Sequence, residues 1–222
     1  ATILGHKGDL MLLHLRRTFE DLQAAQVAVA RLGLASFLEP TTSFVSVVEL
    51  GMYEMTAQIH RRLGERALKA GTDEFERAFD AEMEEQRRRV SGRLWADVPA
   101  RRHVCFYPMN KRRGEHKNWY AVPFAERAQM MLDHGRIGRK YAGEVNQIIS
   151  GSIGYDDWEW GVDLFADDPV VFKKLVYEMR FDEASAPFGE FGDFYVGMQL
   201  PLDQLFRRLC LLATLVALSV IV

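Results

Sequence analysis

The residues best suited to chemistry lie in a short strand-like run, residues 105–111, with the sequence CFYPMNK. Side chains alternate across a strand, so Tyr107, Met109 and Lys111 share one face. A phenol, a thioether and an ammonium make a poor core but suit a pocket for a flat, apolar and anionic molecule. The alternative is an ordinary half-buried edge strand whose lysine reaches to water. Pro108 agrees with an edge, because it cannot donate a ladder hydrogen bond.

His134 is the candidate metal ligand. It follows Met130 by four residues and Met131 by three, so it lies over the methionine side of the helix expected there. A single histidine in such a place commonly caps or packs a helix, and no second His, Cys or carboxylate stands around it at zinc-like spacing. Haem, however, needs only one axial ligand from the protein. The remaining histidines form no metal motif: His6, His14, His60, His103 and His116.

Several basic residues could grip carboxylates, because the guanidinium of arginine matches a carboxylate with a two-point fork. The residue types alone do not select among them. The set consists of Arg93, Lys111, Arg112, Arg113, Arg139 and Lys140. The sequence contains no Walker loop, no GxGxxG opening a helix and no GxSxG elbow, so it carries none of these nucleotide-binding or hydrolase motifs.

The second half of the sequence contains the elements that must position these residues. Hydrophobic periodicity, turn residues and helix caps predict the order β-α-β-β-α-β, which is the ferredoxin-like unit. Asp168 is a good helix N-cap and Pro169 a good first helical residue, while Gly135 is expected to end the earlier helix. The predicted elements are residues 104–111, 123–133, 145–153, 158–165, the helix from 169 to 179, and residues 191–198.

The first half repeats part of this pattern. Its order is β-β-α-β, which matches the second unit without its opening strand and helix; the predicted elements are residues 2–5, 10–15, 18–38 and 44–50. The fold class predicted is therefore α+β, with two ferredoxin-like repeats of the dimeric α+β barrel type. Either the sequence begins inside the first repeat, or that unit is natively incomplete. The predicted divisions are residues 1–50, 51–92, 93–200 and 201–222.

The connector and the C-terminal tail differ from the repeats in composition. Sixteen of the thirty residues from 61 to 90 are charged, which predicts an exposed helical connector on the surface, with Phe75, Phe79 and Met83 spaced four apart. Residues 209–222 carry no charge. As a helix they would span about 21 Å, less than the roughly 30 Å apolar core of a bilayer. We expect a terminal helix buried against the fold or a neighbouring subunit; weak membrane contact is the alternative.

Composition excludes several classes of protein. The chain of 222 residues is 48% hydrophobic and 27% charged, as expected of a folded globular protein. A net charge of -3 favours no nucleic-acid partner, because a phosphate-binding protein would carry a basic surplus. Two cysteines, Cys105 and Cys210, are too few for a disulfide-stapled secreted fold, so we expect a reducing, cytoplasmic compartment.

Taken together, an ordered series of motifs resembles the chlorite-dismutase-like family, and within it the peroxide-dependent coproheme decarboxylases. The motifs are YPMNKRR at 107–113, NWY at 118–120, HG at 134–135, GRKYAG at 138–143, QIISG at 147–151, WEWGV at 158–162 and FKKLVYEMRFDE at 172–183. The resemblance is dense over residues 93–200 and looser over residues 1–50. It implies a subunit of two ferredoxin-like repeats, which agrees with the repeat above, and a homopentamer.

The resemblance also implies roles for individual residues. His134 falls on the axial iron ligand, Tyr107 on a catalytic tyrosine that becomes a radical, and Lys111 on a lysine that holds and processes a propionate. Arg93 and Ser185 fall on propionate-binding positions. The residues implied to line the porphyrin or face its open side are Tyr107, Pro108, Met109, Asn110, Lys111 and Gln147. Glu183 is a candidate partner for the far nitrogen of His134.

The activity implied is oxidative decarboxylation of two propionates of iron coproporphyrin III to vinyls, giving haem b. Hydrogen peroxide is the oxidant, and the iron porphyrin is both substrate and redox cofactor. One alternative is a chlorite dismutase-like haem enzyme, but that activity is associated with a distal arginine where this sequence has the uncharged Gln147. The other is a non-catalytic haem carrier or sensor, which would keep His134 without needing Tyr107.

Overall fold

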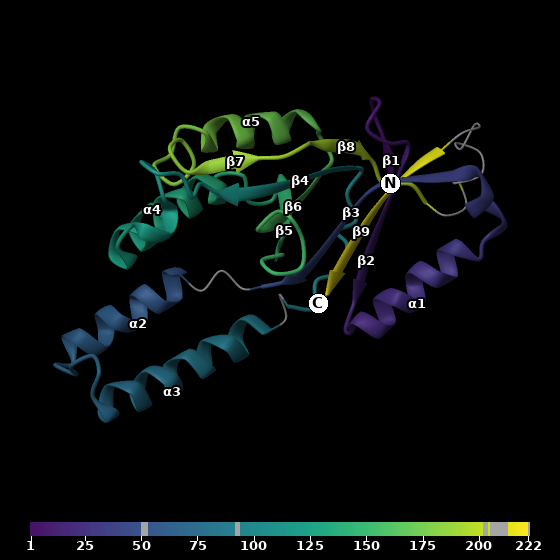
Figure 1. The fold of residues 1–222 in the computed structure, drawn as a ribbon. Helices are drawn as coiled ribbons and strands as arrows, with labels where there is room; N and C mark the ends of the chain where they lie inside the picture. Colours follow the sequence, from purple (N-terminus) through teal and green to yellow (C-terminus); the bar gives the residue numbers. More distant parts are fainter. Residues whose placement is uncertain (50–52, 92–93, 202–203, 205–212, 222) are drawn as a thin grey trace.

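The computed structural model describes residues 1–49, 53–91, 94–201, 204 and 213–221. Figure 1 shows a large curled sheet with helices α4 and α5 on one side, and two further helices projecting away from it. The sheet combines strands from both halves of the chain in the order β6-β5-β3-β9-β2-β1-β8-β4-β7, and β6 also pairs with β4. The α+β class and the ferredoxin-type arrangement predicted from the sequence are confirmed.

The second repeat has the predicted order of elements. Its sheet runs β8-β4-β6-β5, and every neighbouring pair is antiparallel. The last predicted strand is split, because residues 192–194 separate two short strands. The elements are β4 (His103–Lys111), α4 (Phe124–Arg139), β5 (Val145–Gly151), β6 (Trp160–Ala166), α5 (Val170–Met179), β7 (Gly189–Phe191) and β8 (Tyr195–Met198).

Helix α4 is longer than predicted. It does not end before Gly135 but continues to Arg139, so that His134 lies inside it and not in its last turn. Gly138 lies where α4 passes α5, and a Cβ added there would be 3.3 Å from Cε of Met179. The absence of a side chain at this position allows the close approach of the two helices, so packing outweighs the low helix propensity of glycine.

The first repeat contains the β-β-α-β series predicted for it, with altered boundaries. The hydroxyl of Thr18 accepts a hydrogen bond from the amide of Asp21 and caps the helix, which ends well before Leu38. A short 3-10 turn, Gly33–Phe37, leads into a strand that starts earlier than predicted. The elements are β1 (Thr2–Ile3), β2 (Leu10–Arg16), α1 (Phe19–Ala30) and β3 (Leu38–Val48).

The C-terminal tail is a strand where a helix was predicted. β9 (Ala213–Ile221) lies between β2 and β3 and pairs with both, in parallel. Residues 209–212 and 222 of the predicted helix lie outside the described residues. An uncharged apolar run fits a buried strand as well as a buried helix, because periodicity alone does not distinguish the two. Its place in the sheet gives the strand backbone partners on both sides.

Two apolar clusters lie on opposite faces of the second repeat's sheet. One cluster joins the two repeats and includes Phe44, Phe106 and Phe165. The other lies between the sheet and helices α4 and α5 and includes Tyr107, Leu164 and Leu175. Because successive residues of a strand point to opposite faces, β4 contributes to both clusters.

The connector forms two helices, not one. α2 (Tyr53–Glu65) and α3 (Asp73–Val90) lie side by side in Figure 1, away from the sheet, and α2 also contacts α4. Ile59 and Leu63 of α2 pack with Phe75 of α3 in an apolar cluster of their own. The regularly spaced Phe75, Phe79 and Met83 form the face of α3 that packs in this cluster.

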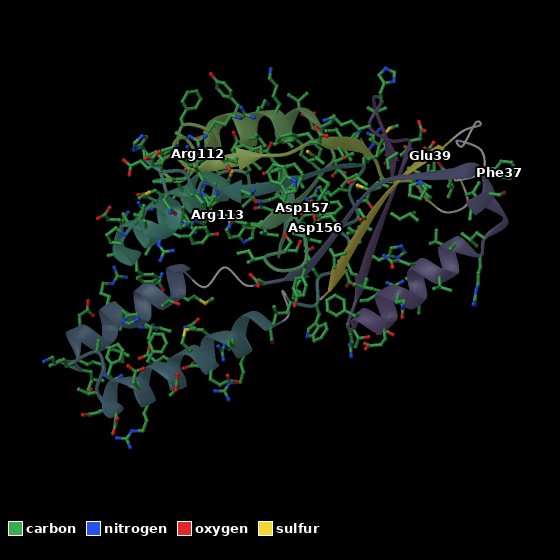
Figure 2. The ribbon with its side chains drawn as sticks, in the orientation of Figure 1. Phe37, Glu39, Arg112, Arg113, Asp156 and Asp157 are labelled. Atoms are coloured by element: carbon green, nitrogen blue, oxygen red, sulfur yellow. The ribbon has the colours of Figure 1, made fainter. Side chains whose placement is uncertain are left out.

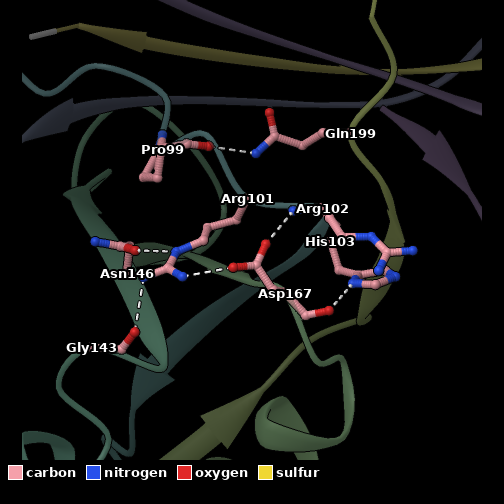
Figure 3. A network of polar contacts seen from close by, with 8 residues as sticks. All are labelled: Pro99, Arg101, Arg102, His103, Gly143, Asn146, Asp167 and Gln199. Carbon is pink, nitrogen blue, oxygen red and sulfur yellow. Dashed lines mark hydrogen bonds and ion pairs between the residues drawn. The ribbon is translucent and has the colours of Figure 1, made fainter.

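A polar network fixes the entrance to β4 (Figure 3). Nε of Arg101 donates to Oδ1 of Asn146 at 2.8 Å, and its two terminal nitrogens reach Asp167 at 2.7 Å and the carbonyl of Gly143 at 2.9 Å. The amide of Arg102 also donates to the carboxylate of Asp167. The segment before β4 is thereby tied to the start of β5 and to the residue that follows β6.

Among the described residues, no helix combines the length and the apolar character needed to cross a membrane.

Candidate functional site

The predicted shared face of β4 lies inside the molecule. Tyr107 is 5% exposed, and its ring stacks on Phe194 with the centroids 4.5 Å apart. The register pairs Tyr107 with Val162 of β6, so that both side chains lie on the face towards α4 and α5. Met109 is partly buried in the same cluster. Pro108 does not make β4 an edge strand, since β4 lies between β6 and β8.

Burial raises the pKa of the Tyr107 phenol well above its ordinary value, and the neighbouring Cys105 adds to the rise. The phenol therefore keeps its proton at neutral pH. A tyrosine in this environment can lose an electron and a proton together, but it is a poor source of free phenolate.

Lys111 ends the strand in an enclosed position. Its Nζ donates to the carbonyl of Ala184 at 2.5 Å and lies 4.6 Å from the centroid of the Trp119 ring. Burial lowers the pKa of Lys111 to about 8, with nearby Asp182 acting in the opposite direction. The alternative, in which this lysine reaches to water, is wrong, because the side chain turns inward onto the turn after α5.

His134 is held by a carboxylate. Its Nδ1 lies 2.8 Å from Oδ2 of Asp182, and 26% of the histidine side chain is exposed. A hydrogen bond from Nδ1–H to a carboxylate places the lone pair on Nε2, which is the form that binds a metal. The same carboxylate oxygen accepts a hydrogen bond from the hydroxyl of Ser185 at 3.3 Å.

One turn, residues 182–185, links the histidine to the lysine. Oδ1 of Asp182 accepts hydrogen bonds from the amides of Ala184 and Ser185, at 2.9 and 2.8 Å. The carbonyl of Ala184 receives the ammonium of Lys111. The carboxylate that orients His134 and the carbonyl that holds Lys111 therefore belong to the same rigid turn, between α4 and the end of β4.

The remaining residues of 107–111 face the other way. Pro108 lines a cavity with Phe106 on the opposite face of the sheet. The amide oxygen of Asn110 accepts a hydrogen bond from the amide of Glu159 at 2.7 Å. These two residues can meet a ligand on the Tyr107 face through the backbone alone. Buried Glu159 accepts a hydrogen bond from the amide of Lys111 at 2.9 Å and pairs with Arg113 at 3.5 Å, which fixes the end of β4. Figure 2 labels Arg112 and Arg113, which follow β4 directly.

Two further predicted residues are Gln147 and Arg93. Gln147 of β5 is exposed. It pairs with Leu164 of β6, which pairs with Cys105 of β4. Gln147 therefore lies on the same sheet face as Tyr107, with β6 between their strands. Arg93 lies outside the described residues. The structure thus brings Tyr107, Lys111, His134 and Ser185 into one region of the second repeat.

The acid beside His134 is not the predicted Glu183. Glu183 is exposed, and its neighbour Asp182 makes the hydrogen bond. A signal for Asp182 was present, because an aspartate two residues before a turn commonly accepts the following backbone amides. Trp119 was also missed; it packs with Ala184 and Phe188 and forms the wall over which Lys111 lies.

The arrangement offers a distinct set of chemical groups. These groups are an imidazole with a fixed tautomer on α4, and a buried neutral phenol and a buried ammonium on β4. Such a set suits a ligand that is flat and apolar, binds a histidine through a metal, and carries anionic arms.

The comparisons with known proteins identify the family of the chain. The model of the chlorite dismutase family matches residues 1–200. A solved structure described as a novel heme-binding protein from Thermus thermophilus is 42% identical, with a TM-score of 0.71, and the match covers 93% of this chain and 73% of that one. A chlorite dismutase variant from Candidatus Nitrospira defluvii is 20% identical with a TM-score of 0.44, and the match covers 54% of this chain and 50% of that one. With the family model matched over residues 1–200, this chain belongs to the chlorite dismutase family.

Proposed function

We propose that this chain binds an iron porphyrin through His134 and converts iron coproporphyrin III to haem b with hydrogen peroxide. The observation that carries the proposal is the turn 182–185, which holds the imidazole of His134 and the ammonium of Lys111 on the same side as buried Tyr107. Membership of the family and the likeness to a protein described as heme-binding support the porphyrin part.

The residues present fit an iron porphyrin. The Nδ1–H of His134 is committed to Asp182, so Nε2 is the available donor for iron. The apolar cluster around Tyr107 would cover the macrocycle, and the bound iron porphyrin would supply the redox chemistry with peroxide. Each propionate and one molecule of peroxide would yield a vinyl group, carbon dioxide and two molecules of water.

Tyr107 and Lys111 have separate roles in this proposal. The phenol, protonated because of its burial, would give up an electron and a proton to the oxidant that peroxide and the bound iron porphyrin supply, and would then take a hydrogen atom from the β-carbon of a propionate. Transfer of a second electron from the substrate to the same oxidant would release carbon dioxide and leave the vinyl group. Lys111 holds a propionate carboxylate, exchanging the carbonyl of Ala184 for the anionic group. Ser185 is a second donor, while Gln147 would face the open side of the iron. Holding the carboxylate sets which carbon meets Tyr107.

The decisive experiment adds iron coproporphyrin III and hydrogen peroxide to the purified protein and follows the porphyrin by mass spectrometry. The proposal expects two successive losses of carbon dioxide and a final mass equal to haem b. Tight binding of haem without any decarboxylation would instead support the haem carrier. Sustained oxygen release from chlorite would support a chlorite dismutase.

By the resemblance we also propose a homopentamer located in the cytoplasm. Sedimentation of the purified protein tests the assembly, and a monomer at micromolar concentration would reject it. For residues 201–222, weak membrane contact is the alternative to packing within the protein or against a neighbouring subunit. Flotation of the protein with anionic vesicles tests this alternative.

A further inference from the structure

A cavity of about 460 Å³ lies on the face of β4 that is opposite to the Tyr107 face. Phe106 and Pro108 line it from β4, and its other walls come from β3, from the turn between β5 and β6, and from residues 191–195. The proposed porphyrin site uses the Tyr107 face, so this cavity is separate from it. Its volume is that of a site for a small organic molecule.

Aromatic side chains make up much of the cavity wall. Phe106 contacts both Phe44 and Tyr195, with ring centroids 5.3 and 6.1 Å away, and all three residues are buried. Trp158 also lines the cavity, and Gly192 lets its ring lie close, because a Cβ on the glycine would be 2.8 Å from Cζ2 of the indole. The face of an aromatic ring attracts cations through its negative quadrupole.

Three carboxylates line the same cavity, and none of the described residues that line it is basic. Asp156 is held in place, since its Oδ2 and Oδ1 accept hydrogen bonds from the amides of Val45 and Asp157, at 3.0 and 2.9 Å. Asp157 follows it in the turn between β5 and β6 (Figure 2) and is exposed, and Asp193 is the third acid. The described residues include no group of three or more His, Cys, Asp or Glu side chains that could hold a metal ion. The acids therefore favour an extended cation over a metal.

A fourth acid lies on the same sheet face. Asp163 is opposite Phe106 in the antiparallel register, so the two side chains are neighbours on the face that bears the cavity. Asp163 is 1% exposed, and its Oδ1 has no hydrogen-bond partner within the described part of the chain. A cation in the cavity would bring a positive charge towards this buried carboxyl group.

The chain places an ammonium of its own at the edge of the cavity. Nζ of Lys7 lies 3.1 Å from Oδ1 of Asp193, donates to the carbonyl of Phe194 at 3.2 Å and is 5.8 Å from the centroid of the Tyr195 ring. A carboxylate, a carbonyl and an aromatic face thus already bind an alkylammonium there. The side chains of Lys7 and Asp193 are 44% and 68% exposed, so the pair contributes little stability and another ammonium can replace it.

We propose that this cavity is a binding site for a small organic cation that carries an ammonium group at each end of an apolar chain. One ammonium takes the place of Lys7 beside Asp193, and the other lies at Asp156 and Asp157. The apolar chain between them covers the rings of Phe106 and its neighbours. A metal ion offers those rings no apolar surface, and a neutral molecule offers the carboxylates no positive charge.

Titration calorimetry of the full chain with cadaverine, at low ionic strength, tests the site. We expect saturable binding of one molecule per chain, weaker binding of pentylamine and no binding of the corresponding diol. Asp157→Lys should abolish saturable binding. Asp80→Lys, on α3, changes the net charge equally and should bind as the parent does. No saturable binding to the parent, equal binding of the diol, or an equal loss in the two variants would overturn the proposal.

Lys7→Met is a test in the opposite direction. It should strengthen the binding of cadaverine by about two-fold to five-fold, because the exposed ion pair with Asp193 no longer competes. Exposed Lys117→Met removes the same charge and should leave the affinity unchanged. Equal affinities in these two variants would contradict the exchange of ammonium groups at Asp193 and overturn the proposal.

Trp158→Leu tests the aromatic wall. Leucine keeps an apolar surface but has no ring, so the affinity for cadaverine should fall by about two-fold to five-fold, while exposed Trp95→Leu should have no effect. Thermal unfolding checks that each variant is folded. Unchanged affinity in a folded Trp158→Leu variant would show that the cation does not lie against this wall and would overturn the proposal.

Discussion

Asp182 and His134 are joined by a hydrogen bond of 2.8 Å between two elements that are 48 positions apart in the sequence. The carboxylate is almost fully buried and accepts two backbone amides of its own turn as well. His134 and neighbouring hydrogen bonds hold the pKa of Asp182 below its usual value, although burial, the largest single influence, acts in the opposite direction. The acid is thus ionised at neutral pH and fixes the orientation of the imidazole.

Asp182→Asn should weaken binding of iron porphyrin by about 10-fold to 100-fold, because an amide holds the imidazole tautomer less firmly than a carboxylate. The absorbance titration with haem measures this, and the iron–histidine stretching frequency in the ferrous form should fall with it. Exposed Glu183→Gln is the control and should match the parent. An unchanged spectrum and affinity in Asp182→Asn would show that the hydrogen bond does not act on the iron ligand.

His134→Ala should lose most of its affinity for iron porphyrin, because the variant has no axial donor on α4. Added imidazole should restore the spectrum of the histidine-bound form, which a general loss of folding would not allow. Exposed His116→Ala serves as the control. A titration identical to that of the parent would mean that another residue binds the iron.

Tyr107→Phe should keep porphyrin binding and yield no decarboxylated product. Phenylalanine preserves the stacking on Phe194 but has no hydroxyl to oxidise. Product masses after a fixed number of peroxide additions measure the effect, and exposed Tyr177→Phe is the control. Product formation at the parent rate would reject the radical role of Tyr107.

Lys111→Met should stabilise the protein without ligand at pH 7 and weaken binding of iron coproporphyrin. Burial lowers the pKa of Lys111 from 10.5 to about 8, so the folded state binds its proton more weakly than the unfolded state. Stability should therefore rise as the pH increases from about 8 to 10.5, by up to about 3 kcal/mol. Methionine removes this dependence, and urea unfolding at pH 7 and pH 9.5 measures it. Exposed Lys117→Met is the control and should keep the pH dependence of the parent. A Lys111→Met variant that is less stable than the parent at both pH values would contradict the expectation.

Asp163→Asn should remove a second pH dependence, of opposite sign. Asp163 is 1% exposed, its Oδ1 has no hydrogen-bond partner among the described residues, and burial raises its pKa to about 7. The folded state then holds the proton more tightly than the unfolded state, so stability falls between about pH 4 and pH 7 and stays lower above that. The full loss is about 4 kcal/mol. Chemical denaturation at pH 5 and pH 8 should show the loss in the parent and not in the variant.

The strand that carries the site was predictable because its signal is local. Alternation along β4 alone placed Tyr107, Met109 and Lys111 on one face, and the structure has them there. The partner of His134 was not predictable from local pattern, because Asp182 reaches it through a turn whose geometry depends on α5. The same holds for the inward turn of Lys111, which follows from the position of Ala184.

Two elements were mispredicted because tertiary packing outweighs local preference. Gly135 suggested the end of a helix, but the contact between α4 and α5 at Gly138 favours a residue without a side chain and keeps the helix intact. The apolar tail offered no periodicity to distinguish helix from strand, and its pairing with β2 and β3 decides the choice.

The apolar cluster of Ile59, Leu63 and Phe75 belongs to the helical pair α2 and α3 and is separate from the clusters of the two repeats. A region with its own small core can melt as its own cooperative unit, ahead of the rest. The helical pair approaches the site where α2 meets α4. There the ring centroid of His60 lies 6.4 Å from that of Phe124, at the start of the helix that bears His134. Calorimetry should then resolve an early transition for the helical pair, and a ligand on His134 should delay the main transition far more than the early one.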